Sequence, residues 1–378
     1  MAAGPFLFTN QSTQNSNMTS PNPSASSAKE APRHIAVIGA GMAGIACART
    51  LVQAGHQVTI FEKSRGAGGR MATRSTGFGG FDHGAQYFTV RDPRFALALE
   101  TAKGIVKPWS ANLVRVLDPF GRVAAAGLPA REPHWVPTPG MTALVQHWAK
   151  PLLDAGSLKL ETLVTRIERD TLTPKKWQLR TNGMPGTPDA EQVFSGFDAV
   201  LLAQPNPQAQ SLLENSAQAP KLVREINKVR VAPCWTLMLA FPQAIQPNMA
   251  HLGPQWNAAR STHHRIAWLA RESSKPGHAG VERWTVQASA AWSHEHLEDD
   301  DARIQGKMLR AFAEVTGIRA EPSFAAVHRW RYAQTVQPLG QSHLWDKAVR
   351  IGACGDWCIG HRIEDAFVSG LELALAVI

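Results

Sequence analysis

Residues 34–70 have the sequence HIAVIGAGMAGIACARTLVQAGHQVTIFEKSRGAGGR. The apolar run at 35–38 predicts a buried strand, which leads into the glycine-rich turn GAGMAG at 39–44 and then into a helix-like segment. Gly55 ends that helix, and residues 58–62 predict a second strand that finishes on an acid. The order of strand, glycine turn, helix, strand and acid is the order found in dinucleotide-binding folds.

The glycines of the turn have separate tasks. Gly39 permits the tight turn, Gly41 lets the backbone approach a pyrophosphate, and Gly44 lets the helix pack closely on the strand. The backbone N–H groups at the start of the helix, around Met42 and Ala43, favour the same anion. We therefore expect a bound dinucleotide here; a glycine turn that merely packs is the alternative.

The segment after the second strand indicates which dinucleotide binds. Glu62 lies eighteen residues after the last glycine of the turn and is placed to accept hydrogen bonds from a ribose diol. Lys63 follows it and opens a glycine-rich stretch that ends in Gly69, Arg70 and Met71. An ordinary NAD-binding fold lacks this second cluster, whose permissive backbone and arginines suit another contact with the phosphates. A flexible basic surface loop is the alternative.

Composition bounds the class of protein. With 378 residues, 44% of them hydrophobic and 18% charged, the chain is long enough for two domains. The four cysteines form no CxxC pair, so we predict no metal site and a reducing, cytoplasmic location. No apolar run is long enough to span a bilayer, which predicts a soluble protein. The net charge of +9 is scattered, which argues against nucleic acid but could attract a phosphate-bearing substrate.

The chain is predicted to fold as an interrupted domain with insertions. The first 32 residues are rich in Ser, Asn and Pro, which predicts a disordered tail, with Met18 as an alternative first residue. An apolar strand at 197–203 and a closing strand, Gly-Asp turn and helix return to the first domain. The predicted parts are a tail, 1–32; a cofactor domain, 33–100, 138–205 and 340–378; and a substrate domain, 101–137 and 206–339.

Four motifs carry a resemblance to a known family. They are GAGMAG, FEKSRGAGGRM, DHGAQYFT at 82–89, and CGDWC followed by RIEDAFVSG near the C-terminus. Together they resemble the renalase branch of the FAD-dependent amine oxidase superfamily, most closely its bacterial members, over nearly everything after residue 33. The resemblance implies an α/β fold in which a Rossmann-like (GR2-type) FAD-binding domain is interrupted by a mixed α+β substrate domain, as in amine oxidases and p-hydroxybenzoate hydroxylase.

The same resemblance implies noncovalent FAD and assigns its contacts. Glu62 would hold the adenosine ribose, Val164 would meet the adenine end, and Asp356 would bind on the ribityl and phosphate side. The helix that begins at Ile363 and Glu364 would point its positive end at the flavin N1 and C2 carbonyl. The other implied contacts are Gly39, Gly41, Met42, Ala43, Gly44, Lys63, Gly69, Arg70, Met71, Ala85, Gln86, Tyr87 and Gly355.

The resemblance also implies an activity. Renalases oxidise dihydronicotinamide isomers that carry the hydride at C2 or C6 to NAD(P)+, by hydride transfer to flavin N5, and pass the electrons to oxygen as hydrogen peroxide. The product becomes aromatic, so no general base is required, and an apolar slot beside the flavin suffices. The alternatives are a small-amine oxidase or desaturase on the same scaffold, and a flavin-based redox-sensing module without turnover.

Three residues are candidate substrate contacts, and no catalytic residue is predicted. His83 and Tyr87 belong to the DHGAQYFT segment, where a flat ring could lie against small residues. Gln287 stands in a strand where members of the family carry a histidine; a glutamine can hydrogen-bond but cannot be charged. Tryptophans of the second domain, among them Trp268 and Trp330, could wall the slot or simply pack in a core. The sequence does not predict the exact substrate, the electron acceptor or the oligomeric state.

Overall fold

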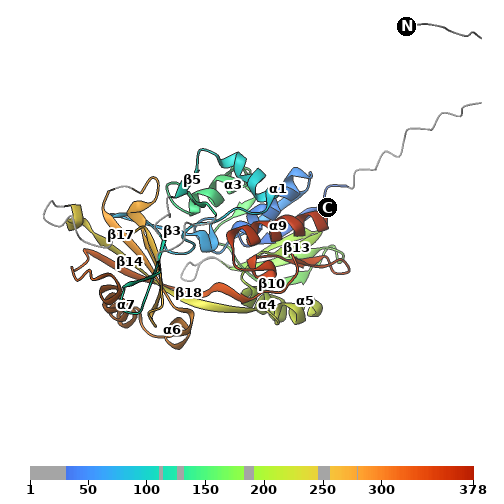
Figure 1. Cartoon of the computed structure of the whole chain (residues 1–378). Helices are drawn as coiled ribbons and strands as arrows, with labels where there is room; N and C mark the ends of the chain where they lie inside the picture. The colour runs from blue at the N-terminus through green and yellow to red at the C-terminus, as the bar shows by residue number, and fades with distance from the viewer. Residues whose placement is uncertain (1–30, 110–113, 126–131, 183–190, 246–255, 279) are drawn as a thin grey trace, which may run out of the picture. The chain divides into compact units, whose positions relative to one another are not determined.

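A computed structural model describes residues 31–109, 114–125, 132–182, 191–245, 256–278 and 280–378 (Figure 1). Residues 1–30, which include nearly all of the predicted tail, lie outside the described residues. Residues 32–378 form one compact unit. None of the helices in the described part of the chain has the length and apolar character needed to cross a membrane.

A six-stranded sheet is built around the strand predicted at the start of the sequence. Its strands, in sheet order, are β19 (Leu344–Asp346), β20 (Ile351–Ala353), β13 (Ala199–Leu202), β1 (His34–Ile38), β2 (Gln57–Phe61) and β9 (Leu158–Lys159). All pairs are parallel except β19 with β20. β13 lies between β20 and β1, and its four residues are buried, so the predicted central strand near 197–203 is confirmed.

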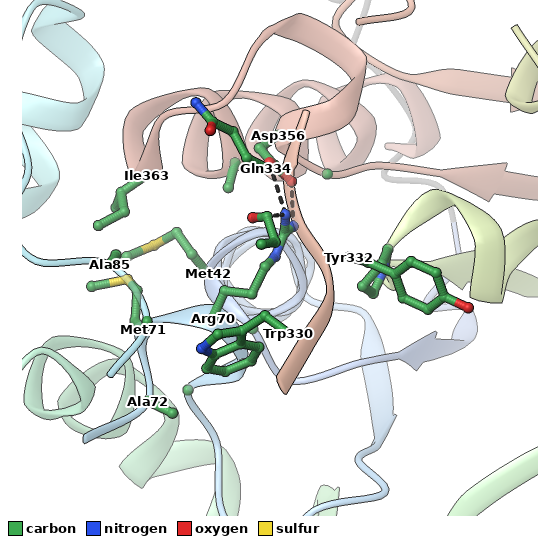
Figure 2. Close-up of a pocket in the computed structure, with 18 of the residues that line it drawn as sticks. Met42, Arg70, Met71, Ala72, Ala85, Trp330, Tyr332, Gln334, Asp356 and Ile363 are labelled. Atoms are coloured by element: carbon green, nitrogen blue, oxygen red, sulfur yellow. Dashed lines mark hydrogen bonds and ion pairs between the residues drawn. The ribbon is translucent and has the colours of Figure 1, made fainter. Parts of the chain in front are cut away.

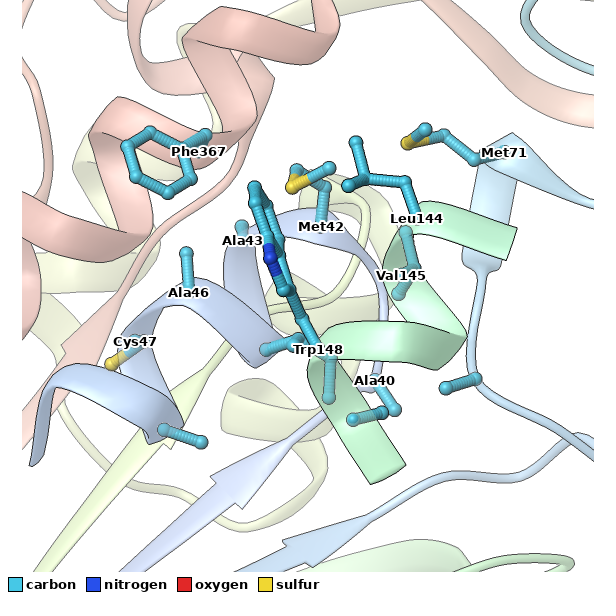
Figure 3. Close-up of a cluster of buried hydrophobic side chains, with 14 of the residues drawn as sticks. Ala40, Met42, Ala43, Ala46, Cys47, Met71, Leu144, Val145, Trp148 and Phe367 are labelled. Atoms are coloured by element: carbon cyan, nitrogen blue, oxygen red, sulfur yellow. The ribbon is translucent and has the colours of Figure 1, made fainter. Parts of the chain in front are cut away.

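Three helices cover one face of this sheet: α1 (Met42–Gln53), α3 (Thr142–Asp154) and α9 (Ile363–Val377). Figure 1 shows α1 and α9 side by side, although one begins the fold and the other ends it. In Figure 3 the ring of Trp148 from α3 lies between Met42 and Ala43 of α1 and Phe367 of α9. The motif at the start of the chain is therefore packed directly against the C-terminal helix.

The opposite face carries a second sheet and two helices. The antiparallel sheet is β10 (Leu163–Arg169), β11 (Trp177–Asn182) and β12 (Gln192–Phe197), and the helices are α4 (Asn206–Asn215) and α5 (Pro220–Ile226). They share one apolar cluster with the six-stranded sheet. The preceding strand β9 joins the parallel sheet, so the antiparallel sheet starts only at β10. Since α4 and α5 pack here, we now propose that the first domain extends to about residue 229.

A seven-stranded sheet forms the other half of the fold. Its strands, in sheet order, are β18 (Phe324–Gln337), β14 (Arg230–Phe241), β17 (Glu282–Ala288), β16 (Ile266–Arg271), β15 (Ala258–Ser261), β6 (Val114–Leu117) and β7 (Val123–Ala125). Successive side chains of a strand point to opposite faces. On one face a row of apolar residues packs against α7 (Asp301–Thr316): Ala259, Leu269, Val286, Leu237 and Val327.

Short elements complete the described structure. They are the strand pairs β3 (Thr73–Thr76) with β4 (Gly79–Asp82) and β5 (Val106–Trp109) with β8 (His134–Pro137), the helices α2 (Pro93–Leu99), α6 (Ala290–Glu295) and α8 (Asp356–Ile359), and the 3₁₀ helices η1 (Gly69–Met71), η2 (Glu100–Ala102), η4 (Pro242–Ile245) and η6 (Glu272–Ser274). The loop between β4 and α2 contains the DHGAQYFT segment. It connects the two halves of the fold at the place where both sheets end.

Candidate active site

A cavity of about 1800 Å³ is lined by the carboxyl ends of β1, β2 and β13, by the turn before α8, and by one face of the seven-stranded sheet. Pockets for single drug-sized ligands span roughly 300 to 1,000 Å³, so this one has room for a dinucleotide and a second molecule. Carboxyl ends of parallel strands are the usual place for a nucleotide in such sheets. All the predicted site residues line this cavity except Gly44 and Glu364.

The glycine turn has the close contacts that its sequence predicts. Gly39 has a φ of +109°, which strains any other residue. A Cβ on Gly44 would lie 1.9 Å from the carbonyl oxygen of Gly39, so Gly44 packs the helix on the turn and does not face the cavity. A Cβ on Gly69 would lie 3.2 Å from the Cα of Gly41. The two glycine clusters therefore meet, and they leave backbone exposed along one wall.

Glu62 is buried at the end of β2, with both carboxylate oxygens engaged. Oε2 accepts a hydrogen bond from the backbone N–H of Ala40 at 2.8 Å, and Oε1 accepts one from that of Ser64 at 2.8 Å. The acid thus joins the glycine turn to the start of the second cluster. Each oxygen retains lone pairs for a ligand hydroxyl, which suits the ribose contact we propose for it.

Arg70 and Asp356 form an ion pair in the cavity (Figure 2). Nη1 of Arg70 donates to Oδ2 of Asp356 at 3.0 Å, and the second guanidinium nitrogen donates to Oδ1. The hydroxyl of Thr335 in β18 also donates to Asp356, at 3.2 Å. Residues far apart in the sequence thus bring a cation, an acid and a hydroxyl to the surface where we place the phosphates and the ribityl chain.

Apolar side chains lie beside this pair. Figure 2 shows Met42, Met71 and Ala85 together on one side of the view, with Ile363 near them. The two methionines are 5% and 3% exposed and come from the two glycine clusters. Val164 of β10 lines the same cavity. The combination of exposed glycine backbone, a buried acid at the end of β2, an arginine beside the glycine clusters and an apolar wall fits FAD.

The side chain of Glu364 does not line the cavity, so a flavin contact at this position stays a prediction for the backbone at the start of the helix. Its Oε1 accepts hydrogen bonds from the backbone N–H groups of Arg91 and Asp92, both at 2.6 Å. The side chain therefore fastens α9 to the loop before α2. Ile363, one residue earlier, does line the cavity, so the start of this helix stays a predicted cofactor contact.

The loop of residues 82–88 forms the wall between the two halves of the cavity and is held from several sides. The backbone N–H of Ala85 donates to Arg70 O at 2.9 Å, and the indole N–H of Trp330 donates to His83 O at 2.9 Å. Nε2 of Gln287 donates to Gly84 O at 2.7 Å. Gln287 therefore fixes this loop with one N–H of its neutral amide.

Below that loop lies a buried ion cluster that the sequence did not predict. Nζ of Lys275 is 2.9 Å from Oδ2 of Asp82 and 3.1 Å from Oε2 of Glu272, and it donates to Gln86 at 3.3 Å. His278 approaches the same Glu272 oxygen at 3.3 Å. Asp82, Glu272 and His278 have the spacing of a metal site, but the ammonium of Lys275 already lies between the two carboxylates and offsets part of their charge. The cluster anchors Asp82, at the start of the loop, and Gln86 within it.

One register row of the seven-stranded sheet faces the cavity. Paired residues on neighbouring strands share a face, and the row opposite the apolar one runs across five strands. From β15 to β18 it consists of Arg260, Trp268, Gln287, Thr236 and His328. All of these except Thr236 line the cavity. The row places a cation at one end, a neutral amide in the middle and an imidazole at the other end.

Aromatic rings stand beside the row. The ring of Tyr87 lies 4.0 Å from that of His134 and 5.8 Å from that of Trp268, centroid to centroid. Burial, followed by the charge of Arg260, lowers the pKa of His134. All four residues line the cavity, where the rings provide a flat apolar surface. The sequence predicted Tyr87 and named Trp268 as an open choice, but it gave no signal for His134 or Arg260.

A second imidazole group lies under the loop. His83 stacks on Trp330 at 5.3 Å and meets the ring of His328 edge-on at 4.7 Å. Burial first, and then the neighbouring His328, lower the pKa of His83 to about 4. Burial also lowers the pKa of His328, with Arg74 adding to the effect. Both imidazoles are therefore neutral at pH 7.

The fold and the site together define a class, the two-domain nucleotide-binding oxidoreductases. Residues 37–99 match the family model of an NAD(P)-binding Rossmann-like domain, and residues 127–378 match that of the flavin containing amine oxidoreductases. The second match covers more than half of the sequence, so the chain belongs to the flavin containing amine oxidoreductase family. FAD is accordingly its cofactor, and oxidation–reduction is its class of chemistry.

Similarities to individual proteins are consistent with this family. The L-amino-acid oxidase of Bothrops pauloensis is 51% identical over 47 residues, which are 12% of this chain and 9% of that protein. That of Gloydius halys is 55% identical over 42 residues, 11% of this chain and 8% of that protein. The matched stretch thus spans about a tenth of these curated relatives.

Solved structures share the fold over most of the chain. A protein described as a protoporphyrinogen oxidase from Exiguobacterium sp. 255-15 has a TM-score of 0.70 at 14% identity, covering 91% of this chain and 98% of its own. Cyclohexylamine oxidase from Brevibacterium oxydans IH-35A has a TM-score of 0.65 at 13% identity, covering 92% and 98%. The predicted fold class, a Rossmann-like domain with an amine oxidase-type insertion, is confirmed.

Proposed function

We propose that the chain oxidises dihydronicotinamide isomers of the 2- and 6-dihydro type to NAD(P)+, as renalases do, with oxygen as the final acceptor and hydrogen peroxide as its product. FAD, when bound, supplies the acceptor for the two electrons. The chain's own residues would then bind the substrate, orient its ring and exclude water. This reaction makes the ring aromatic, so no side chain is asked to remove a proton.

The observation that carries the proposal is that the carboxylates lining the cavity already have hydrogen-bond or ion-pair partners. Three acidic residues line the cavity in the part of the chain that the structure describes: Glu62, Glu132 and Asp356. Each already binds a backbone N–H or an arginine. An ammonium substrate would therefore find no uncommitted negative charge, whereas a dihydronicotinamide ring is uncharged and flat.

The loop and the aromatic rings suit such a ring. Tyr87 and Trp268 offer a flat apolar surface, and Gln287 lies between them and the loop at Gly84. With its N–H committed to Gly84, the amide of Gln287 has an oxygen left that can accept a hydrogen bond from a carboxamide N–H. The replacement of a histidine by Gln287 is then compatible with a nicotinamide substrate.

Oxidation of a small amine is the second candidate. The same pair of rings, Tyr87 and Trp268, resembles an aromatic cage for an uncharged amine, and cyclohexylamine oxidase shares the fold. That reaction needs the neutral amine, because an ammonium group holds no lone pair to give. The neutral imidazoles of His83 and His328 line the cavity and could accept its proton.

Anaerobic bleaching of the flavin absorbance tests these proposals. The purified holoenzyme is mixed with borohydride-reduced NAD isomers, with ordinary NADH, and with cyclohexylamine and L-amino acids. Rapid bleaching by the 2- or 6-dihydro isomers alone is the expected result. Bleaching by amines only would replace the proposal with the second candidate, and bound flavin that no reductant bleaches would favour a redox-sensing or binding module.

A further inference from the structure

One end of the cavity is rich in cations. Arg91, Arg260 and Arg362 line it together with a single acid, Glu132. Glu132 accepts from Nε of Arg91 at 2.6 Å, and its pKa is lowered first by that hydrogen bond, with Arg362 among the further charges that act on it. Arg260 acts on His134, two residues after Glu132, so three guanidinium groups and one carboxylate gather at this end. This local excess of positive charge differs from the scattered charge of the sequence as a whole.

Among the described residues Arg91 is paired with Glu132, whereas Arg260 and Arg362 form no ion pair, and Arg260 is the one that stands on the sheet row facing the cavity. Among the described residues no carboxylate forms an ion pair with it, and its side chain is exposed to the cavity. Arg329 and Arg331 line the cavity as well, but both are paired with Glu298. Arg260 is exposed and lines the ligand cavity, so its guanidinium is available to pair with an anion that a ligand brings.

The pairing of the strands sets the distance between Arg260 and Gln287, beside which we place the substrate ring. Arg260 pairs with Trp268, and Trp268 pairs with Gln287, so two strand spacings, roughly 10 Å, separate Arg260 from Gln287. Two polar atoms in the wall between them, Nδ1 of His134 and Nε1 of Trp268, are buried without a hydrogen-bond partner. The wall therefore has unused hydrogen-bonding groups on the same side as the cation.

We propose that Arg260, supported by Arg91 and Arg362, forms a subsite for an anionic group that the substrate carries about two strand spacings from the oxidised ring. This inference rests on the proposed function in naming the group: the phosphate of a dihydronicotinamide nucleotide. A carboxylate would use the same charge and the same donors. The subsite distinguishes nucleotides from uncharged ribosides and from simple amines, which have nothing to place beside Arg260.

Substrate pairs that differ only in the anion test the subsite. Anaerobic flavin bleaching of the holoenzyme is compared for a 6-dihydronicotinamide mononucleotide and for the matching riboside, in the wild type, Arg260→Met, Arg260→Lys and Arg319→Met. Arg319 is exposed and lies outside the cavity, so its variant makes the same change in net charge. We expect Arg260→Met to weaken mononucleotide binding roughly 10- to 100-fold, the value of a charge-assisted hydrogen bond, and to leave the riboside unchanged.

The remaining variants sharpen the result. Arg260→Lys should recover part of the mononucleotide binding, Arg319→Met should change nothing, and added salt should raise the KM of the mononucleotide more than that of the riboside. Equal use of nucleotide and riboside by the wild type would overturn the inference. An equal loss in Arg260→Met and Arg319→Met would overturn it as well.

A binding measurement separates this inference from the proposed function. If no dihydronicotinamide bleaches the flavin, the proposed function fails, and the oxidised holoenzyme is titrated with nicotinamide mononucleotide, benzoate and benzamide, followed by flavin absorbance and calorimetry. Binding of either anion that Arg260→Met abolishes upholds the subsite, with benzoate alone indicating a carboxylate and the mononucleotide alone a phosphate. Binding of neither anion, or no better than benzamide, overturns it.

Discussion

Replacement of Lys275 by methionine tests the buried ion cluster most directly. The ammonium is 2.9 Å from Asp82 and 3.1 Å from Glu272, and the side chains of all three are at most 1% exposed. Lys275→Met would leave two carboxylates buried without their cation, which typically costs about 3–5 kcal/mol. Because domains are stable by only about 5–15 kcal/mol, this loss is a large share of the total.

The assay is urea-induced unfolding of the FAD-loaded protein at pH 7. Lys228→Met is the matched control, since the ion pair of Lys228 with Glu225 is exposed and worth at most about 1 kcal/mol. Replacing Asp82 by Asn and Glu272 by Gln together with Lys275→Met should restore most of the stability, because no charge is then buried. A loss no larger than that of Lys228→Met, or no recovery in the triple variant, would refute the reasoning.

The pH dependence of the same variants gives an independent check. Burial alone would raise the pKa of Asp82, but the charges of Lys275 and His278 outweigh it and lower that pKa. A lowered carboxyl pKa stabilises the fold above the ordinary value near 4, and this contribution is lost only as the pH falls below it. In Lys275→Met a buried carboxyl can take up a proton instead, so that variant should gain stability, relative to the wild type, as the pH falls from 7 to 5.

Three further predictions concern the cofactor side and the loop. The pKa of His83 is lowered to about 4 in the fold, against about 6.5 in the unfolded chain, so its contribution to stability is present above pH 6.5 and is lost as the pH falls toward 4. The free energy of unfolding in urea should therefore fall between pH 7 and pH 5 by about 2 kcal/mol less in His83→Gln than in the wild type. Glu62→Gln leaves one backbone N–H without an acceptor and should weaken FAD binding roughly 10- to 100-fold in a fluorescence titration, whereas unchanged affinity would exclude Glu62 from the site. Gly44→Ala would place a Cβ 1.9 Å from the carbonyl oxygen of Gly39 and should prevent FAD retention. The control is Gly306→Ala, in helix α7 with open space around it, which should stabilise the protein by about 0.5–1 kcal/mol in thermal unfolding.

The cofactor half of the site was predictable because its parts are close in the sequence. The turn at Gly39, the acid at Glu62 and the cation at Arg70 lie within one strand, helix and strand, and each residue type is demanded by local geometry. The direction of the Glu364 side chain could not be predicted, because in the first turn of a helix it depends on what packs there. In this chain two backbone N–H groups of the preceding loop take the carboxylate.

The substrate half was less predictable, for a physical reason. Arg260, Trp268, Gln287 and His328 come from four strands and meet only because of strand register, which alternation within one strand does not specify. Lys275 was missed because lysine is almost never fully buried unless it is paired, and its partners Asp82 and Glu272 are far from each other in the sequence. Alternation within each strand indicates which residues share a face, but only the pairing of the strands shows which of them are neighbours.

The alternation of the seven-stranded sheet also explains why family membership defines the cofactor but leaves the substrate open. The apolar row that holds α7 and the polar row that faces the cavity occupy the same strands but opposite faces. Substitutions such as Arg260→Met therefore alter the cavity without changing Leu269, Val286 or the helix packed on them. A scaffold of this kind can exchange an anion subsite for an aromatic cage at little cost in stability, so the identity of the substrate has to be sought along the polar row.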